Sequence, residues 1–422
     1  MPEPINKQDF FDEISNLPID LNNKKILVGV SGGADSLCLA LLLKDLKFNI
    51  IAAIVNHNLR SESLAEANKV GEILANHQID HVILNWEHDA KPTTKIQELA
   101  RNARFKLFNE YASQNGIKYL FLGHNQDDQA ETFIFRLCKG SGLDGLTAIK
   151  SVTQLDDLTI VRPLLGYSRS SIEATLLERK QTWINDPSNQ NTKFARVRIR
   201  NIVKALETEG LTPEVIAQTI YKLDLAKDCL NSQALKFIND HCKFDDFGFI
   251  TISSLDLNSL HLELRYRVAQ KLLKIIGGKY YQPKRKQLVY LINMLNPDKN
   301  SKAFTFCGCY ICFKKDKIYF IREANSVTCN PIVADNMWDN RFNIRFLSTK
   351  KNLKIKPLGN VGYCMVPKEL RRISMPYKAH WSLPAIWDND FLIAVPHLEY
   401  YSRSDIMTAK EIRELKFKPK LI

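Results

Sequence analysis

Four short and uniformly apolar segments alternate with helical patterns in the first half of this 422-residue chain. The apolar segments are residues 25–30, 50–55, 81–86 and 119–124. Because apolar and polar side chains do not alternate in them, they are typical of strands that are covered on both faces. The intervening helical patterns are residues 36–47, 61–77 and 94–115. This order predicts βαβ units, a parallel sheet and ligands bound at the carboxyl ends of its strands.

The pattern changes in the second half of the chain. A further strand candidate at 159–165 precedes a helix that begins near Ser168, and a loop is expected at 185–192. The later segments are mainly helical at 201–240 and 260–276, β-like at 303–323 with bends at Gly308 and Asp316, and a candidate linker at 325–340. We therefore predict an α/β catalytic domain at 1–205, a mainly helical domain at 206–330 and a small basic α+β domain at 341–422.

The positive charge of the chain is concentrated at one end. Lys and Arg number 59 against 46 Asp and Glu, which gives a formal net charge of +13. Sixteen basic and seven acidic residues lie in 341–422, so most of the excess falls in the last fifth of the chain. A basic region of this kind favours a polyanionic partner such as nucleic acid, and a basic surface that only aids solubility is the alternative.

Composition also limits the compartment. The longest apolar run, residues 37–43, is far shorter than the roughly 20 residues of a membrane span. Residues 1–13 lack the basic and apolar segments of a signal peptide. Nine cysteines, an odd number at low density, suit reduced thiols. We therefore expect a cytoplasmic protein with no membrane partner.

The residues directly after the first strand candidate form a candidate anion site. Residues 31–36 read SGGADS and open a helix. Two glycines let backbone N–H groups approach a phosphate, and the helix N-terminus adds its dipole. Asp35 would repel that phosphate unless Mg²⁺ lay between them. A plain strand-to-helix turn is the alternative, but the full motif in this context favours the anion site.

A cluster of acidic residues follows the fourth strand candidate. Asp127, Asp128 and Glu131 lie within about one helical turn, close to His124 in the sequence. Three acids without a counter-charge repel one another, so we expect a cation there, either Mg²⁺ or an ammonium group. A helix dipole explains one or two acids in a first turn, but not the histidine beside them.

Basic residues occur at two places that suit phosphates. Arg101 and Arg104 share one face of a predicted helix. Arg196, Arg198 and Arg200 lie in a segment, 187–206, that holds five basic residues and no acid. Surface ion pairs and a solvated helix face are the respective alternatives.

Several of these segments resemble one enzyme superfamily. Residues 31–36 resemble the pyrophosphate loop of the N-type ATP pyrophosphatases, which split ATP between its α and β phosphates. Residues 123–132 (GHNQDDQAET) resemble the Gly-His-His-x-Asp-Asp-Gln-x-Glu-Thr segment of tRNA(Ile)-lysidine synthetases and some tRNA thiolases, with Asn125 in place of the second His. The segments that are also similar to lysidine synthetases are 55–60, 100–105, 162–165, 183–189, 196–200, 366–372 and 384–386, with Asn56, Asn58, Phe105 and Val197 as departures.

The resemblance implies both an activity and its substrates. Lysidine synthetases have an adenine nucleotide α-hydrolase-like fold. They join free L-lysine to C2 of the wobble cytidine of CAU-anticodon tRNA(Ile), through an adenylated tRNA, and they release AMP and pyrophosphate. ATP and Mg²⁺ are the implied cofactors, and a homodimer stays open beside a monomer.

The resemblance also implies roles for individual residues. The implied catalytic residues are Asp35, Arg104, His124 and Asp128. The implied ATP-binding residues are Ser31, Gly32, Gly33, Ala34, Asp35 and Ser36, and Asp35 would also hold Mg²⁺. The implied lysine-binding residues are Asp127, Asp128 and Glu131. The implied tRNA-binding residues are Arg101, Arg196, Arg198, Arg200, Lys368, Arg371 and Arg372.

Two other functions remain open. A tRNA 2-thiolation enzyme of the same superfamily uses a Cys-x-x-Cys pair near the loop, whereas residues 24–202 hold only Cys38 and Cys138. A non-catalytic RNA-binding protein on the same fold is disfavoured by the intact residues 31–36 and 127–128. ATP–pyrophosphate exchange would distinguish the enzyme from the binding protein.

Overall fold

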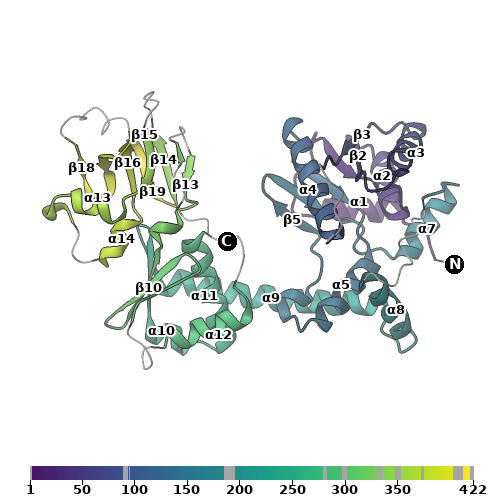
Figure 1. Ribbon diagram of the computed structural model, residues 1–422. Coiled ribbons are helices and arrows are strands. Elements are labelled where there is room, and N and C mark those ends of the chain that lie inside the picture. Colours follow the sequence, from purple (N-terminus) through teal and green to yellow (C-terminus); the bar gives the residue numbers. More distant parts are fainter. Residues whose placement is uncertain are drawn as a thin grey trace. The chain divides into compact units, whose positions relative to one another are not determined.

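The computed structural model describes residues 2–88, 94, 96–184, 195–278, 283–296, 302–327, 330–331, 336–346, 353–371, 375–402 and 412–418. The chain divides into two compact units, Met1–Lys227 and Asp228–Ile422 (Figure 1).

The first unit is built on a six-stranded sheet with the order β3-β2-β1-β4-β6-β5. Its parallel strands are β1 (Ile26–Gly29), β2 (Ile50–Asn56), β3 (His81–Asn85), β4 (Tyr119–Leu122) and β6 (Leu158–Val161). The edge strand β5 (Val152–Leu155) pairs antiparallel with β6. The predicted strands and their parallel order are confirmed, and β5 is an addition that its half-polar sequence does not predict.

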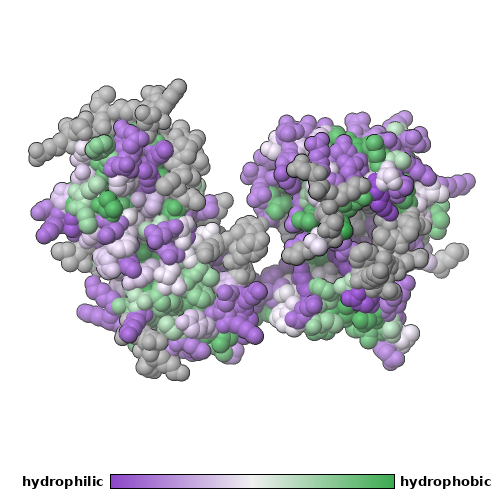
Figure 2. Space-filling model, in the orientation of Figure 1, coloured by the Kyte–Doolittle hydropathy of each residue, from purple (hydrophilic) through white to green (hydrophobic). Residues whose placement is uncertain are grey.

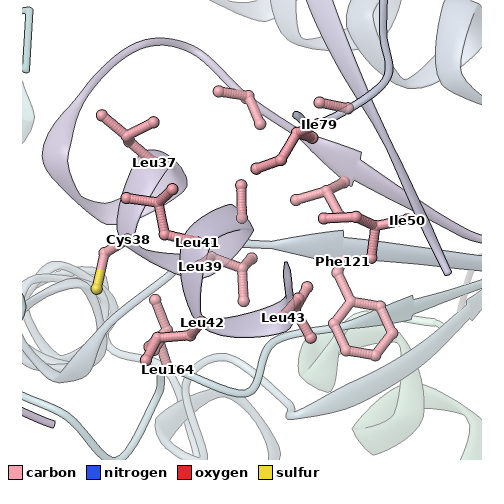
Figure 3. Packing of buried hydrophobic residues seen from close by; sticks show 14 of the residues in the cluster. Leu37, Cys38, Leu39, Leu41, Leu42, Leu43, Ile50, Ile79, Phe121 and Leu164 are labelled. Atoms are coloured by element: carbon pink, nitrogen blue, oxygen red, sulfur yellow. The ribbon is translucent and has the colours of Figure 1, made fainter. Parts of the chain in front are cut away.

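Helices cover both faces of this sheet (Figure 1). The helices on one face are α1 (Lys7–Ser15), α2 (Ala34–Asp45), α3 (Ser63–Asn76) and α7 (Arg169–Glu178), and α4 (Ile96–Gln114) covers the other. Alternate residues of β1 point to the two layers, since Val28 packs under α2 and Leu27 packs with Phe108 of α4. Figure 3 shows the leucines of α2 beside Ile50 and Phe121. Coverage on both faces explains why the strands are uniformly apolar.

A helical layer completes the first unit. Its helices are α5 (Gln126–Cys138), the short α6 (Leu143–Leu146), α8 (Ala195–Glu207) and the first half of α9 (Pro213–His241). Ile134, Val203 and Ile216 share a core between α5, α8 and α9. Figure 2 shows a mainly hydrophilic surface, with apolar side chains along the edge formed by α5 and α8, where Phe135 and Ile202 are exposed.

The second unit begins with an antiparallel sheet packed on helices. The sheet has the order β7 (Cys242–Asp245), β8 (Phe249–Ser253), β11 (Lys317–Arg322), β10 (Cys309–Lys314) and β9 (Phe304–Phe306). The helices beside it are α10 (Ser254–Ser259), α11 (Leu262–Gly277) and α12 (Arg285–Met294). The predicted helices at 201–240 and 260–276 and the β segment at 303–323 are confirmed, with turns at Gly308 and next to Asp316.

Two further sheets form the rest of the second unit. One has the order β12 (Asn330–Pro331), β15 (Leu353–Pro357), β16 (Pro384–Asp388), β17 (Phe391–Val395) and β18 (Tyr400–Tyr401). The other has the order β13 (Asn336–Trp338), β14 (Phe342–Phe346) and β19 (Ile412–Phe417). The helices α13 (Gly359–Met365) and α14 (Tyr377–Trp381) lie in the same region.

The predicted linker at 325–340 is wrong in its last part. It contains β13, and Trp338 is 3% exposed. The carboxylate of Asp339 accepts hydrogen bonds from Arg322 and from the fully buried Arg341, at 2.7–2.9 Å. Arg341 also donates to the carbonyls of Gly248 and, at 3.3 Å, Ser382. This segment therefore joins the sheets of the second unit, and the predicted boundaries of the three domains stay a prediction.

Candidate active site

The loop after β1 has the geometry of an anion site. Gly32 has φ +83°, and a Cβ there would lie 2.6 Å from Val70 Cγ2 and 3.2 Å from Ile184 Cδ1. The carbonyl of Gly32 accepts the N–H of Ile184 at 2.9 Å, which fixes the loop from outside. Gly33 is the N-cap of α2 and provides no side-chain cap, so the first-turn N–H groups suit an anionic ligand.

The two serines of the loop differ in what they offer a ligand. The Ser36 hydroxyl accepts the N–H of Ser31 at 3.1 Å and donates to the carbonyl of Gly33 at 3.1 Å. Ser36 is also buried, whereas Ser31 is exposed. Ser36 therefore builds the loop, and Ser31 is the serine that is open to a ligand.

Asp35 lies on the first turn of α2, against the end of β4. Gly123 permits this approach, since a Cβ there would lie 2.8 Å from the backbone carbonyl of Asp35 and 2.9 Å from the N atom of Ser36. The Nδ2 atom of Asn125 donates to Asp35 Oδ1 at 2.8 Å. Burial raises the pKa of Asp35 to about 6, and the negative charges of Asp128 and Asp127 add to this. The structure thus brings the predicted loop and the predicted acidic cluster together.

The acids of α5 accept hydrogen bonds within the chain, and the expectation that they lack a counter-charge is wrong for Glu131. Asp127 Oδ2 accepts the N–H of Arg169 at the start of α7, at 2.8 Å. Glu131, which is 5% exposed, pairs with Arg200 Nε at 2.6 Å. Burial raises the pKa of Asp128 and of Glu131, so a cation beside either would be favoured.

Arginine side chains gather around His124, and some of the nitrogen atoms there have no hydrogen-bond partner. Burial and the charges of the surrounding arginines lower the pKa of His124 to about 3. Burial likewise lowers the pKa of Arg104 and of Arg162 to about 10, so both stay charged at neutral pH. Among the described residues, no hydrogen-bond partner reaches Nε of Arg104, Nε of Arg162 or Nδ1 of His124. Arg162 does donate through Nη1 to the carbonyl of Lys150 at 2.8 Å and to Thr153 Oγ1 at 3.0 Å. The open nitrogen atoms and the positive charge of the two arginines suit an anionic ligand.

The neighbouring strand end of β2 is held by an amide network. Asn56 donates to Asn58 and to Asn85 at 2.8 and 2.9 Å, and Asn58 adopts the left-handed conformation, φ +53°, which its side chain tolerates. His57 lies close enough to Arg104 for that charge to lower its pKa, after burial as the main cause. Asn56 and Asn58, two residues at which the sequence departs from the family pattern, therefore stabilise the end of β2 through these hydrogen bonds.

Comparison with known proteins identifies the family. A family model of the PP-loop domain matches residues 6–206. A tRNA(Ile)-lysidine synthase of Wolbachia pipientis wMel is 33% identical over 397 residues, which cover 90% of this chain and 90% of that protein. The chain belongs to the tRNA(Ile)-lysidine synthase family.

Other relatives carry the same name. A tRNA(Ile)-lysidine synthase of Orientia tsutsugamushi is 30% identical over 421 residues, with 95% of this chain and 94% of that protein covered. Among solved structures, a U34-tRNA thiolase of Methanococcus maripaludis matches with a TM-score of 0.43 and 20% identity, over 51% of this chain and 79% of that one. The PP-loop match and the parallel sheet confirm the predicted fold class.

The cysteines of this lysidine synthase family member bear on the alternative of a tRNA 2-thiolation enzyme. Burial raises the pKa of the Cys38 thiol to about 12, so this cysteine is not a ready nucleophile, and Cys138 lies far from it in the sequence. None of the described helices is long and apolar enough to cross a membrane.

The acids also fit a magnesium ion that would come with ATP. No group of three or more His, Cys, Asp or Glu side chains in the described residues is arranged to hold a metal by itself. Mg²⁺ is commonly bound by one or two carboxylates together with substrate phosphates, rather than by a complete protein cage. Asp35 beside the loop matches that donor set, since it is a hard oxygen ligand whose carboxylate is destabilised by burial and by nearby acids.

The predicted tRNA-binding residues are spread over both units. Arg196 and Arg198 are exposed on α8, and Arg101 is exposed on α4, while Arg200 is engaged with Glu131. In the second unit Lys368 is exposed, whereas Arg371 donates to the carbonyls of Val366 and Cys364. Arg372 lies outside the described residues.

Sequence reasoning missed two residues of this site. Arg162 belongs to the segment 162–165, for which the sequence predicts no role, yet it is 7% exposed and its charge is, after burial, the next cause of the low pKa of His124. A lone arginine inside an otherwise apolar strand segment was the available signal. The other is Asn125, and the available signal was that it stands where the family pattern has a histidine.

Proposed function

We propose that this chain ligates L-lysine to C2 of the wobble cytidine of tRNA(Ile) with a CAU anticodon, at the expense of ATP. The observation that carries this is the meeting of the loop at 31–36 with the segment His124–Asp128 at the carboxyl ends of β1 and β4, in a chain of the lysidine synthase family. Arg104 and Arg162 lie close to His124.

In the first step the C2 oxygen of cytosine attacks the α-phosphorus of ATP, and pyrophosphate leaves with the electrons of the broken P–O bond. The first-turn N–H groups of α2 and the charges of Arg104 and Arg162 stabilise the negative charge that develops on the leaving group. Mg²⁺ held by Asp35 and the phosphates would supply further charge stabilisation. His124 stays neutral at working pH, so it acts as a hydrogen-bonding group there.

In the second step an amine of lysine attacks the activated C2, loses a proton, and AMP leaves with the former C2 oxygen. Of the three acids, Asp128 is the one we assign to lysine, because Asp127 caps α7 and Glu131 pairs with Arg200. Asp128 Oδ2 accepts only the N–H of Asn125, at 3.2 Å, among the hydrogen bonds of the described residues. It would either hold the lysine ammonium or accept the proton of the attacking amine.

Incubation of the purified chain with ATP, labelled lysine and a tRNA(Ile) transcript, followed by nucleoside analysis, tests the function. We expect lysine-dependent formation of lysidine and, without lysine, adenylated tRNA and pyrophosphate exchange. Asp35→Ala should abolish both products while tRNA binding persists. Wild-type turnover of this variant at saturating ATP would refute the assignment of the loop.

A matched pair of variants tests the role of Asp128. Asp128→Asn keeps an oxygen for the N–H of Asn125 but removes a charge-assisted hydrogen bond of ~1.5–3 kcal/mol, which raises the KM for lysine about 10- to 100-fold. Adenylated tRNA should then accumulate. Asp127→Asn, the control on the same helix, should lower Tm and leave the KM for lysine unchanged. Equal loss of pyrophosphate exchange and lysine transfer in Asp128→Asn would assign Asp128 to ATP instead.

We also propose that exposed basic residues of both units bind the tRNA phosphates, among them Arg101, Arg196 and Lys368. Removal of the region after Asn340 is a poor test, because Phe247 and Phe249 share a core with Leu358 and Val366. Lys368→Gln is cleaner and should lower the log–log salt slope of tRNA binding by ~0.7–0.9. Lys106→Gln, at an exposed ion pair of α4, is the control, and an unchanged slope for Lys368→Gln would remove it from the interface.

The remaining substrate and assembly predictions have direct tests. Whether free L-lysine is the substrate, as opposed to another amine, is tested by adding unlabelled amines as competitors of labelled lysine in the same assay. Light scattering across a concentration series distinguishes a homodimer from a monomer.

A further inference from the structure

Asn125 connects the two halves of the candidate site. It lies between β4 and α5 and is 3% exposed. Its Oδ1 atom accepts the N–H of Asp128 at 3.0 Å, and its own N–H donates to Asp128 Oδ2 at 3.2 Å, which forms a capping box on α5. Its Nδ2 atom donates to Asp35 Oδ1 at 2.8 Å, across 90 residues of sequence.

The orientation of this amide is fixed by chemistry. A backbone N–H can only donate, so the atom that faces Asp128 N must be the amide oxygen. The amide nitrogen then faces the carboxylate of Asp35, which accepts. Both ends of one short side chain are therefore committed, one to the first turn of α5 and the other to the first turn of α2.

The backbone supports the same link. A Cβ at Gly123 would collide with the carbonyl of Asp35, so β4 and α2 approach as closely as their main chains allow. The neutral amide also holds Asp35 without cancelling its charge, which a lysine or arginine would do.

We propose that Asn125 is a positioning residue that orients the Asp35 carboxylate for the magnesium ion of bound ATP, and this rests on the proposed function. With Oδ1 tied to the amide, Asp35 presents its other oxygen in one direction. Without the amide donor, the carboxylate is free to rotate, and the gain in nucleotide affinity that Mg²⁺ provides should shrink.

Three variants at position 125 separate orientation from folding. Asn125→Ser keeps a good N-cap for α5 but is too short to reach Asp35. Asn125→Asp keeps the cap and replaces the donor by a second carboxylate. Asn125→His should keep the gain in nucleotide affinity that Mg²⁺ provides, because an imidazole can accept at one nitrogen and donate at the other. His261 already caps α11 through Nδ1 in this chain.

The readout is the Kd of a non-hydrolysable ATP analogue, measured by calorimetry with Mg²⁺ and with EDTA in the absence of tRNA. The ratio of the two affinities should fall about tenfold in Asn125→Ser, as expected for one misdirected charged contact, and less than about twofold in Asn125→His. In Asn125→Asp the added carboxylate itself attracts the cation, so the ratio should not fall. A purely structural role would change both affinities together and leave the ratio as in the wild type.

A double-mutant cycle with Asp35→Ala completes the test. If Asn125 acts through Asp35, Asn125→Ser has no further effect on the ratio in the Asp35→Ala background. Additive effects, or a wild-type ratio in Asn125→Ser, would overturn the proposal. The control Asn6→Ser changes an equivalent cap on α1, whose Oδ1 accepts the N–H groups of Gln8 and Asp9, and should leave the ratio unchanged. Lysidine formation by the wild type tests the proposed function separately, because it does not depend on these ratios.

Discussion

The acidic and basic sides of the candidate site are completed in different ways. On the acidic side the carboxylates accept hydrogen bonds from the chain itself: Asp35 from Asn125, Asp127 from the N–H of Arg169, and Glu131 from Arg200. On the basic side, Nε of Arg104, Nε of Arg162 and Nδ1 of His124 find no such partner among the residues that the structure describes. These acids therefore accept hydrogen bonds from the fold, whereas the three nitrogen atoms on the basic side are open to a ligand, although Arg162 Nη1 donates to Lys150 and Thr153.

This difference separates folding from function. Hydrogen-bonded acids stabilise the start of α5 and its contacts with α7 and α8. A desolvated nitrogen atom without a hydrogen-bond partner destabilises a fold, and proteins retain such groups mainly where they act on a ligand. The triphosphate of ATP has the charge and the number of oxygens to complete them. The comparison therefore predicts that variants on the two sides fail in opposite ways.

The largest expected effect is on the basic side. Arg104→Gln should slow ATP–pyrophosphate exchange about 100-fold or more, as when one donor to a developing negative charge is removed. Its Tm should stay constant or rise, because the charge that is removed is largely desolvated and its Nε atom has no hydrogen-bond partner. Exchange assays and thermal unfolding measure the two effects on one preparation.

Arg179→Gln is the matched control for this variant. Arg179 pairs with Asp45 at 3.0 Å, so its loss should cost some stability and leave exchange unchanged. A fall in Tm of Arg104→Gln in step with its loss of activity would remove the contrast between the two sides.

Local sequence signals were sufficient for the positions of the strands and for the loop. Uniformly apolar segments predicted the parallel strands, because both faces of β1 and β2 are buried. The paired glycines and the following helix predicted the anion site, and Gly32 does adopt a positive φ. Asn58 likewise has the left-handed conformation that its residue type allows.

These local signals could not predict which residues far apart in the sequence contact one another. The contact of Glu131 with Arg200 spans 69 residues and depends on how α5 packs on α8, so the sequence showed only three acids together. The strand pair of Phe342 with Phe417 is equally remote, and the basic C-terminal segment has no period that reveals it. Trp338 and Arg341 are buried by these sheets, which is why a segment of linker-like composition is part of the core.

A smaller effect is expected on the acidic side. Arg200→Gln leaves the buried Glu131 without its cation and should lower the free energy of unfolding by ~1–3 kcal/mol. Arg196→Gln, four residues earlier on α8, changes an exposed side chain and should leave stability unchanged while it lowers the salt slope of tRNA binding. If Arg200→Gln lowers the salt slope without loss of stability, Arg200 belongs to the tRNA interface and the contrast between the two sides weakens.

The smallest effect concerns the pH dependence of stability. The pKa of His124 is lowered from 6.5 to about 3 in the folded chain, so between these values the unfolded chain binds the extra proton. Stability contributed by the neutral imidazole is therefore present above pH 6.5 and is lost as the pH falls, by about 1 kcal/mol between pH 6.5 and 5.5. Relative to the wild type, His124→Asn should show a shallower loss of stability over this range in urea unfolding.

Pyrophosphate at saturating concentration should also flatten the wild-type slope, because a bound anion offsets the arginine charges that disfavour protonation of His124. Parallel slopes for the wild type and His124→Asn would show that the imidazole does not carry this penalty, and His124 would then lie outside the cluster of unsatisfied bases.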